Sequence, residues 1–296
     1  MHGLDLHQRS RIWLIAGTGE GPSLAAVLLK QGWQLSVAVV SSAAARAYPA
    51  HPALQLEVGA LAGEAAMAAR LNRAHSGGRP FTWVVDASHP FASRVTADLA
   101  RACGRIGQPL LRLQRPLLIP PPGIDPTLLA GLDALGDLNL RGERLLLAIG
   151  ARQLAQAVKF AAGAVPFARL LPSPESLRLG RAAGLTDGQL ACHRPGQLAD
   201  WPELAIERAL LRHWAITSVL CRQSGSQTEL GWQTLCASLG LHLLLLARPA
   251  EPQGGWRLDL AALIERIGSP GLSPEINPGG WPPAPAETPG SGDPAG

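Results

Sequence analysis

Short apolar runs alternate with amphipathic segments through most of the sequence, and this alternation limits the possible folds more than any other feature. In the first half the apolar runs predict five strands, at 12–16, 35–40, 54–58, 83–86 and 109–113. Helices are predicted between several of these strands, at 23–32, 64–73 and 91–106. Strands that alternate with helices are typical of a parallel sheet with helices on both faces. We therefore expect an α/β, doubly wound domain over residues 1–116.

The alternation stops between residues 115 and 142, where Pro and Gly interrupt a leucine-rich stretch, and this break predicts a linker region at 117–142. It then resumes, with strands predicted at 144–149, 167–171, 189–194, 217–221 and 241–247 and helices at 151–162, 203–214 and 228–239. These segments predict a second α/β domain over 143–267. Residues 268–296 are dense in Pro and Gly, which predicts a disordered tail without chemistry of its own.

The charge of the chain favours a small anionic ligand over nucleic acid. Its formal net charge is +4, and nearly all of its cations are arginines, because Lys30 and Lys159 are the only lysines. Arginine side chains suit carboxylate and phosphate groups. They are scattered along the sequence, and only four Phe and one Tyr are available to stack on bases. We expect no nucleic-acid partner.

Several other classes of site are disfavoured by what the sequence lacks. The four cysteines show no CxxC spacing and the eight histidines are isolated, so we predict free thiols and no metal. There is no signal-peptide pattern and no long apolar run. We therefore expect a soluble, cytoplasmic protein without a membrane partner.

The first strand leads into a glycine-rich turn, Ala16-Gly-Thr-Gly-Glu-Gly21, that opens a helix. Glycines let the backbone approach a phosphate, and the N–H groups of a helix N-terminus attract the anion. The turn predicts a dinucleotide site that is formed by Gly17, Thr18, Gly19 and Glu20. The alternative is that the strand-to-helix turn needs glycine for steric reasons alone.

The end of the second strand bears on which dinucleotide fits. A carboxylate at this position would hold the ribose hydroxyls of NAD, but the sequence has none there. Ser41, Ser42 and Arg46 could instead hold a 2′-phosphate, which favours NADP. An ordinary solvated loop remains the alternative.

Missing motifs exclude two common chemistries, short-chain dehydrogenase and P-loop phosphoryl transfer, and disfavour a third, that of α/β-hydrolases. The only tyrosine is Tyr48 and the residue four positions later is Pro52, so the Tyr-x-x-x-Lys pair of short-chain dehydrogenases is absent. The sequence also lacks a G-x-x-x-x-G-K-[ST] phosphate loop and a G-x-S-x-G nucleophile elbow.

The segment WVVDASHPFA places Asp86, Ser88 and His89 at the end of a strand. Three roles are open for His89: a contact to cofactor or substrate, a proton source, or a structural cap. Pro90 suits a first helical position, with Ser88 or His89 as the N-cap. A helix N-terminus lowers the pKa of a nearby imidazole, which disfavours the proton source. Asp86 either fixes the turn or touches a ligand.

Taken in order, five motifs resemble those of the precorrin-6A reductase family, which includes the cobalt-precorrin-6A form. They are the GTGE turn, DASHPFA, LLRLQRP at 110–116, AIGAR at 148–152 and CRQSGSQT at 221–228. The resemblance spans about residues 11 to 250. The family's GGT-x-E turn has Ala16 in place of its first glycine, and its Lys-Asn-Ser-Gly-Gly stretch is replaced by residues 222–226, so the role of Arg222 is open.

The resemblance implies two Rossmann-like domains with the substrate in the cleft between them. NADPH on the first domain would pass a hydride to a double bond of the macrocycle in cobalamin biosynthesis, and a proton would be added to the neighbouring carbon. His89, Asp86 and Ser88 are the predicted catalytic residues. The implied substrate is a tetrapyrrole-derived polycarboxylate, and the resemblance also allows contacts with neighbouring enzymes of the pathway. The residues predicted to bind the substrate are Arg112, Arg115, Arg152, Arg222 and Ser224, with surface ion pairs as the alternative for the arginines.

Two other functions stay open at this point. One is an NADP-dependent oxidoreductase that acts on another polyanionic substrate. The other is a non-catalytic NADP-binding module, in which the departures at Ala16, Arg222, Gln223 and Ser226 mark a decayed site.

Overall fold

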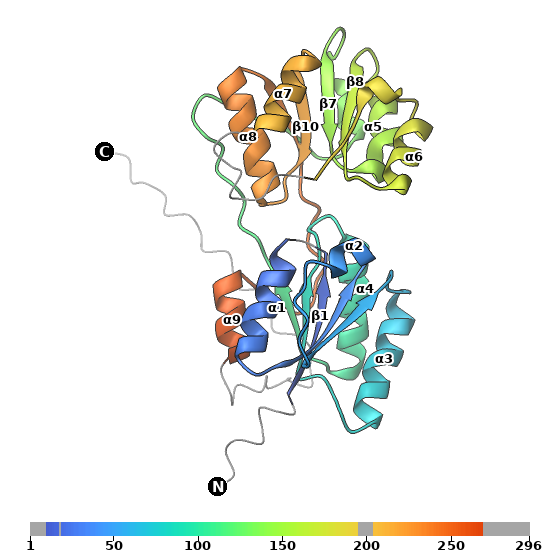
Figure 1. Ribbon diagram of the computed structural model, residues 1–296, viewed down its shortest axis with the longest axis vertical. Helices are drawn as coiled ribbons and strands as arrows, with labels where there is room; N and C mark the ends of the chain where they lie inside the picture. Colours follow the sequence, from blue (N-terminus) through green and yellow to red (C-terminus); the bar gives the residue numbers. More distant parts are fainter. Residues whose placement is uncertain (1–9, 18, 195–203, 269–296) are drawn as a thin grey trace, which may run out of the picture. The chain divides into compact units, whose positions relative to one another are not determined.

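The computed structural model describes residues 10–17, 19–194 and 204–268, and it divides them into two compact units (Figure 1). Unit 1 contains the described residues up to Gln114 and those from Ala250 onward. Unit 2 contains the described residues between Arg115 and Pro249. The chain therefore leaves unit 1, builds unit 2 and returns to complete unit 1.

Unit 1 contains a six-stranded sheet in the order β12-β5-β4-β1-β2-β3, and all of its strand pairs are parallel. The strands are β1 (Arg11–Ala16), β2 (Gln34–Val39), β3 (Leu54–Val58), β4 (Trp83–Ala87), β5 (Leu110–Leu113) and β12 (Trp256–Leu258). The strand order reverses between β1 and β4. In an open α/β sheet, such a reversal leaves a crevice at the carboxyl ends of the two strands, where ligands bind.

Helices cover both faces of this sheet (Figure 1). They are α1 (Glu20–Lys30), α2 (Ser42–Ala45), α3 (Glu64–Ser76), α4 (Ser93–Ile106) and α9 (Leu260–Gly268). Because side chains alternate along a strand, Leu14 of β1 faces the core with α1 and α9, whereas Trp13 faces the core with α3 and α4. Both residues are fully buried.

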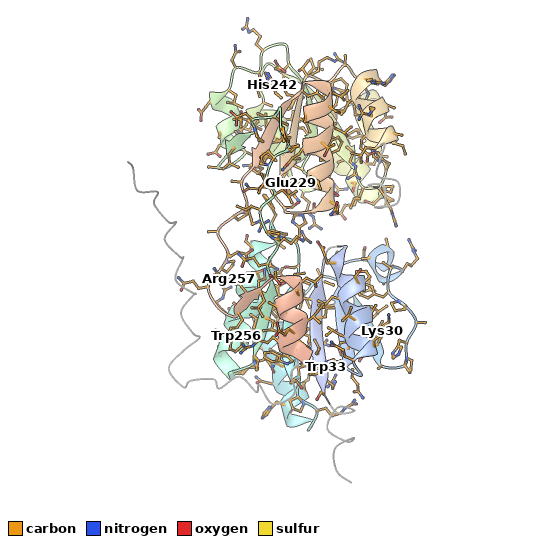
Figure 2. The ribbon with its side chains drawn as sticks, turned by 90° about the vertical axis from the view of Figure 1, so that its left-hand side faces the viewer. Lys30, Trp33, Glu229, His242, Trp256 and Arg257 are labelled. Atoms are coloured by element: carbon orange, nitrogen blue, oxygen red, sulfur yellow. The ribbon has the colours of Figure 1, made fainter. Side chains whose placement is uncertain are left out.

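The segment that returns from unit 2 is anchored firmly in unit 1. Trp256 of β12 packs edge-on against Trp83 of β4, with ring centroids 6.1 Å apart. The guanidinium carbon of Arg266 in α9 lies 4.8 Å from the centre of the Trp256 ring. Figure 2 labels Trp256 and its neighbour Arg257 on this edge strand.

Unit 2 repeats the same architecture, with the sheet order β6-β11-β10-β7-β8-β9 and parallel pairs throughout. Its strands are β6 (Thr127–Leu129), β7 (Arg144–Ala148), β8 (Val165–Leu170), β9 (Leu190–Cys192), β10 (Ser218–Arg222) and β11 (His242–Leu246). The order reverses between β7 and β10. Figure 1 shows α7 (Ala205–His213) and α8 (Gln227–Leu239) on one side of this sheet, and α5 (Leu154–Phe160) and α6 (Pro174–Ala182) on the other.

The predicted fold class is confirmed, since both units are doubly wound parallel sheets with helices. The division of the chain differs from the prediction of 1–116, 117–142 and 143–267. Strand β12 and helix α9 belong to unit 1, and the predicted linker contains β6 and the 3₁₀ helix η1 (Asp133–Asp137), which belong to unit 2. Strands β6 and β12 have only three residues each, too few to show an alternating pattern in the sequence.

The structure describes the four predicted free thiols but only the first residue of the predicted tail. Gly268 ends α9, and the rest of the predicted tail, 269–296, lies outside the described residues. All four cysteines are free; Cys192 is exposed and the other three are buried. Within the described ranges, none of the helices combines the length and the hydropathy that crossing a bilayer requires.

Candidate functional site

The glycine turn and the DASHPFA segment meet at the strand reversal of unit 1. Strands β1 and β4 pair so that Ala16 lies opposite Ala87, which places the two following loops side by side. A β-carbon at Gly17 would lie 3.5 Å from the backbone nitrogen of His89 and 3.6 Å from the Cα of Ser88. The two motifs therefore form one site at the carboxyl ends of the strands.

Gly19 and Gly21 of the glycine turn serve different purposes. Gly19 is the N-cap of α1 with φ −63°, ψ −21°, and no side chain caps the helix. Among the described residues other than its chain neighbours, a β-carbon at Gly19 would meet no atom within 4 Å, so neither conformation nor packing requires glycine there. At Gly21 a β-carbon would overlap the Tyr48 hydroxyl and lie 3.0 Å from the Cβ of Ala16, so packing requires that glycine.

This geometry fits a bound phosphate group. Gly19, the N-cap of α1, has no side chain of its own to cap the helix, and among the described residues the space in front of it is open; anions bind at helix N-termini of this kind. Glu20 is the first residue of α1. Thr18, the remaining predicted cofactor residue, lies outside the described residues.

The three residues predicted to hold a 2′-phosphate follow β2 and are exposed. The Ser41 hydroxyl accepts a hydrogen bond from the backbone N–H of Ala44, 3.2 Å away, and so caps α2. Ser42 opens that short helix and Arg46 follows its end. Nearby, burial raises the pKa of Tyr48 to about 12, so its hydroxyl keeps its proton at neutral pH.

Asp86 and Ser88 shape the turn after β4 from inside the protein. Asp86 is fully buried, and its Oδ1 accepts a hydrogen bond from the backbone N–H of Ser88, 2.9 Å away. The Ser88 hydroxyl lies 3.3 Å from that of Thr96 in α4. Both predicted catalytic side chains thus have partners within unit 1 that fix the loop.

Arg112 joins the same turn, although it was predicted to bind substrate. Only 3% of the residue is exposed. Its Nη1 donates to the carbonyl oxygen of Ser88 at 3.0 Å and to the Ser88 hydroxyl at 3.1 Å, and it lies 3.1 Å from Asp86 Oδ1. Its Nε donates to Glu251 Oε2 at 3.2 Å. The guanidinium group therefore serves a buried network.

His89 lies on the turn itself, and it is not the N-cap of α4. Helix α4 begins at Ser93 with Ala92 as the N-cap, so neither Ser88 nor His89 caps it and Pro90 is not its first residue. The predicted start of the helix at Pro90 was wrong because a separate turn comes first, in which Ala92 N–H donates to His89 O at 2.7 Å. His89 Nδ1 accepts from Phe91 N–H at 3.1 Å, which leaves the proton of the neutral ring on Nε2.

Arg222 ends β10 at the strand reversal of unit 2. Its Nε and Nη2 donate to the side-chain oxygen of Gln153, at 3.1 and 2.6 Å. Burial lowers the pKa of Arg222. Arg152, the residue before Gln153, is exposed in the 3₁₀ helix η2 (Ala151–Gln153).

Glu229 organises the loop that follows β10. Its Oε2 accepts hydrogen bonds from the backbone N–H groups of Ser224 and Gly225, at 2.6 and 2.7 Å. Gln233 donates to Oε1 at 2.9 Å. Burial raises the pKa of Glu229, and these hydrogen bonds oppose the rise. Figure 2 labels Glu229 near the start of α8.

Arg115 and Arg248 pack around the same loop. Arg115 Nη1 donates to the carbonyl oxygen of Ser224 at 3.3 Å, and Arg248 Nη1 donates to the carbonyl oxygen of Arg115 at 2.6 Å. Gly225 has φ +68°, and a β-carbon there would lie 2.9 Å from the Arg115 side chain. Of the predicted substrate residues, unit 2 thus gathers Arg115, Arg222 and Ser224 near the reversal.

Three charged residues of these networks were missed by the sequence reasoning. Glu229 stands three positions after Ser226, a capping-box spacing that could have identified it. Arg248 stands two positions after the end of β11, the same strand-end signal that identified the other arginines. Glu251 carries no such signal, because its contact with Arg112 depends on how the chain returns to unit 1.

Residues 11–267 match the family described as "Precorrin-6x reductase CbiJ/CobK". The chain belongs to this family. It is 34% identical over 257 residues to a cobalt-precorrin-6A reductase of Synechocystis sp., covering 85% of this chain and 94% of the relative. It is 33% identical over 265 residues to a precorrin-6A reductase of Rhodococcus erythropolis, covering 88% and 98%.

A solved structure supports the same family assignment for this chain. The structure of a "CobK precorrin-6A reductase" superposes with a TM-score of 0.70 at 25% identity, covering 87% of this chain and 96% of that one. The family resemblance found in the sequence is therefore confirmed. The reductase is an oxidoreductase of the precorrin-6A step in cobalamin biosynthesis.

Proposed function

We propose that this chain uses NADPH to reduce one double bond of the precorrin-6A macrocycle or of its cobalt-containing form. The observation that carries the proposal is the meeting of the glycine turn that opens α1 with the His89 turn at the strand reversal of unit 1, in a member of this family. The reaction consumes NADPH and one proton and adds two hydrogen atoms to the macrocycle.

The residues that would hold the cofactor surround the carboxyl ends of β1 and β2. Gly17, Gly19 and the first turn of α1 suit the pyrophosphate, with Glu20 beside them and Thr18 retained as a sequence prediction. Ser41, Ser42 and Arg46 suit the 2′-phosphate, and no carboxylate stands at 40–46 to repel it. When bound, NADPH supplies a hydride, so the protein needs no nucleophile.

His89 is proposed to contact the nicotinamide or the macrocycle. Its half-buried ring has Nδ1 occupied by Phe91 N–H, so the neutral ring can donate a hydrogen bond from Nε2. Asp86 and Ser88 support it by fixing the turn. A ring in this neutral state is a positioning contact rather than an acid, which leaves water as the source of the proton.

The carboxylates of the substrate find cations in unit 2. Arg115, Arg222 and Arg248 lie around the loops at the strand reversal, where they donate the hydrogen bonds given above. Exposed Arg152 adds a fourth guanidinium, and Ser224 lies within the same loops. Guanidinium groups suit carboxylates through paired hydrogen bonds.

Anaerobic turnover of metal-free and cobalt-containing precorrin-6A, side by side, tests the proposal. The reaction is run separately with NADPH that carries deuterium on one or the other face of nicotinamide C4. One of the two isomers is expected to deliver its deuterium to the macrocycle, and mass spectrometry detects the transfer. NADH, the matched control, should react more slowly at equal concentration. The faster substrate identifies the pathway branch.

Three results would contradict the proposal. NADPH oxidation with only other polyanionic acceptors would favour a different oxidoreductase. NADPH binding without turnover of either macrocycle would favour a non-catalytic module. A protein that binds no NADPH would remove the basis of the assignment.

A further inference from the structure

We propose that Arg112 is a positioning residue that holds His89 in place, and that Glu251 holds Arg112. This inference rests on the proposed function of the His89 turn. Arg112 lies on β5 directly opposite Asp86 of β4, one strand away from the segment that carries His89.

One guanidinium group is divided between two tasks. Nη1 faces the turn, where it donates to the carbonyl oxygen and the hydroxyl of Ser88, the residue immediately before His89. Nε faces the other way, toward Glu251 Oε2 at 3.2 Å. A planar fork can make both sets of bonds at once, whereas the single nitrogen of a lysine cannot.

Because the network is buried, water cannot readily substitute for its hydrogen bonds. Arg112 is 3% exposed and Asp86 0% exposed. Asp86 Oδ2 is buried and has no hydrogen-bond partner among the described residues, so Asp86 is held through Oδ1 alone. Removing the guanidinium would leave a buried carboxylate without its counter-charge, and the turn would have to rearrange to reach water.

The pair also joins the two points at which the chain crosses between units. Arg112 stands just before the exit after Gln114, and Glu251 is the second residue of the returning segment that starts at Ala250. The returning segment therefore contributes a charge to the support of the His89 turn.

The expected consequence for His89 is a change in the state of its ring. The bond from Phe91 N–H to Nδ1 exists only while the turn keeps its shape, and it selects the tautomer with the proton on Nε2. A loosened turn would release Nδ1 and mix the two tautomers.

The test compares Arg112→Gln, Arg112→Lys and Glu251→Gln with Arg257→Gln. Arg257 is a matched control, because it lies opposite Arg112 on β12 and donates to Pro252 O at 3.2 Å. This hydrogen bond joins Arg257 to the returning segment and not to the His89 turn. ¹⁵N NMR of the imidazole nitrogens, assigned with His89→Ala, reports the tautomer, and thermal unfolding reports folding.

Both Arg112 variants should lose the single Nε2–H tautomer and lower kcat by about 10–100-fold, the usual effect of removing an outer support. Glu251→Gln should show the same changes more weakly. The dissociation constant of NADPH should change by less than about 2-fold, because the glycine turn is untouched. Arg257→Gln should match the wild type in tautomer and kcat.

Several results would overturn the proposal. They are an unchanged tautomer and kcat in Arg112→Gln, full activity in Arg112→Lys, an equal change in Arg257→Gln, or weakened NADPH binding that accounts for the lost rate. If Arg112→Gln does not fold, Arg112→Lys and Glu251→Gln decide. If the wild type reduces neither macrocycle, the proposed function fails, while the NMR comparison still tests the positioning of His89.

Discussion

At the scale of single residues, two glycines of the same turn differ in whether the structure requires glycine. Gly19 has an ordinary helical conformation and open space in front of it. Gly21 is packed against Tyr48 and Ala16. Substitutions at these two positions should therefore separate ligand binding from stability.

Gly19→Ala is expected to leave the free energy of unfolding unchanged or to raise it by up to about 1 kcal/mol, because alanine restricts the unfolded chain. Its methyl group would enter the proposed phosphate site and weaken NADPH binding by about 10-fold or more. Titration calorimetry and thermal unfolding measure the two effects. A lower free energy of unfolding with unchanged NADPH affinity would contradict the assignment of Gly19 to the phosphate site.

Gly21→Ala should do the reverse and destabilise the fold by about 1–3 kcal/mol through overpacking. Tyr48→Phe removes the hydroxyl that the new methyl group would overlap, so the double variant should recover part of the loss. Additive effects in denaturant titrations would show that the Tyr48 hydroxyl is not the cause.

At the scale of secondary-structure elements, a carboxylate ties together the amino ends of two central strands in unit 2. Glu143, just before β7, accepts hydrogen bonds from the hydroxyls of Thr217 and, at 2.7 Å, Ser218 at the start of β10. These hydrogen bonds lower the pKa of Glu143, and the bond from Thr217 has the larger effect.

A lowered pKa in the folded state means that the stabilisation is fully present above the pKa of the unfolded chain and is lost as the pH falls through the folded value. Glu143→Gln is therefore expected to lower stability at pH 7, by less than about 1 kcal/mol because the group is near solvent. The difference should shrink as the pH falls below about 4.5. Thermal unfolding of both proteins from pH 7 to pH 3 measures it, and a constant difference would contradict it.

How far the sequence predicts these elements depends on their length and on what they contact. The long apolar runs of β1, β4 and β10 and the glycine turn mark strand ends on their own. Strands β6 and β12 are short, and they exist because they pair with strands distant in sequence. Helices α6 and α9 were missed for a related reason: α6 follows directly on a predicted strand, and α9 adjoins the Pro/Gly-rich stretch.

The candidate site was predictable to the same degree. The position of His89 at a strand end follows from local sequence, and the structure places it beside Gly17. The helix start was misplaced because Pro90 suits a turn as well as a helix. The inward direction of Arg112 depends on the register between β4 and β5, which no local pattern encodes.

At the scale of the whole molecule, unit 2 is an uninterrupted stretch of chain, whereas unit 1 is made of two pieces. A fragment of residues 115–249 should therefore fold alone and unfold cooperatively. Residues 1–114 lack β12 and α9, so buried Leu28 and Leu113 would lose part of their core. That fragment should be partly folded or aggregate.

Joining 1–114 to 250–268 through a short flexible linker should restore a folded unit 1. Circular dichroism and amide dispersion in NMR spectra of the three chains compare them directly. A well-folded 1–114 fragment would show that the returning segment is dispensable.

The two-piece construction of unit 1 also sets an order of events during synthesis. Its first piece emerges from the ribosome early, yet β5 has to wait as an open sheet edge while all of unit 2 is translated, on the order of ten seconds at typical elongation rates. An open edge invites pairing with other chains. Glu251 is among the last of the described residues to emerge. A growing or prematurely terminated chain can thus display the glycine turn, but it gains the complete support of the His89 turn only after all of unit 2 has been translated.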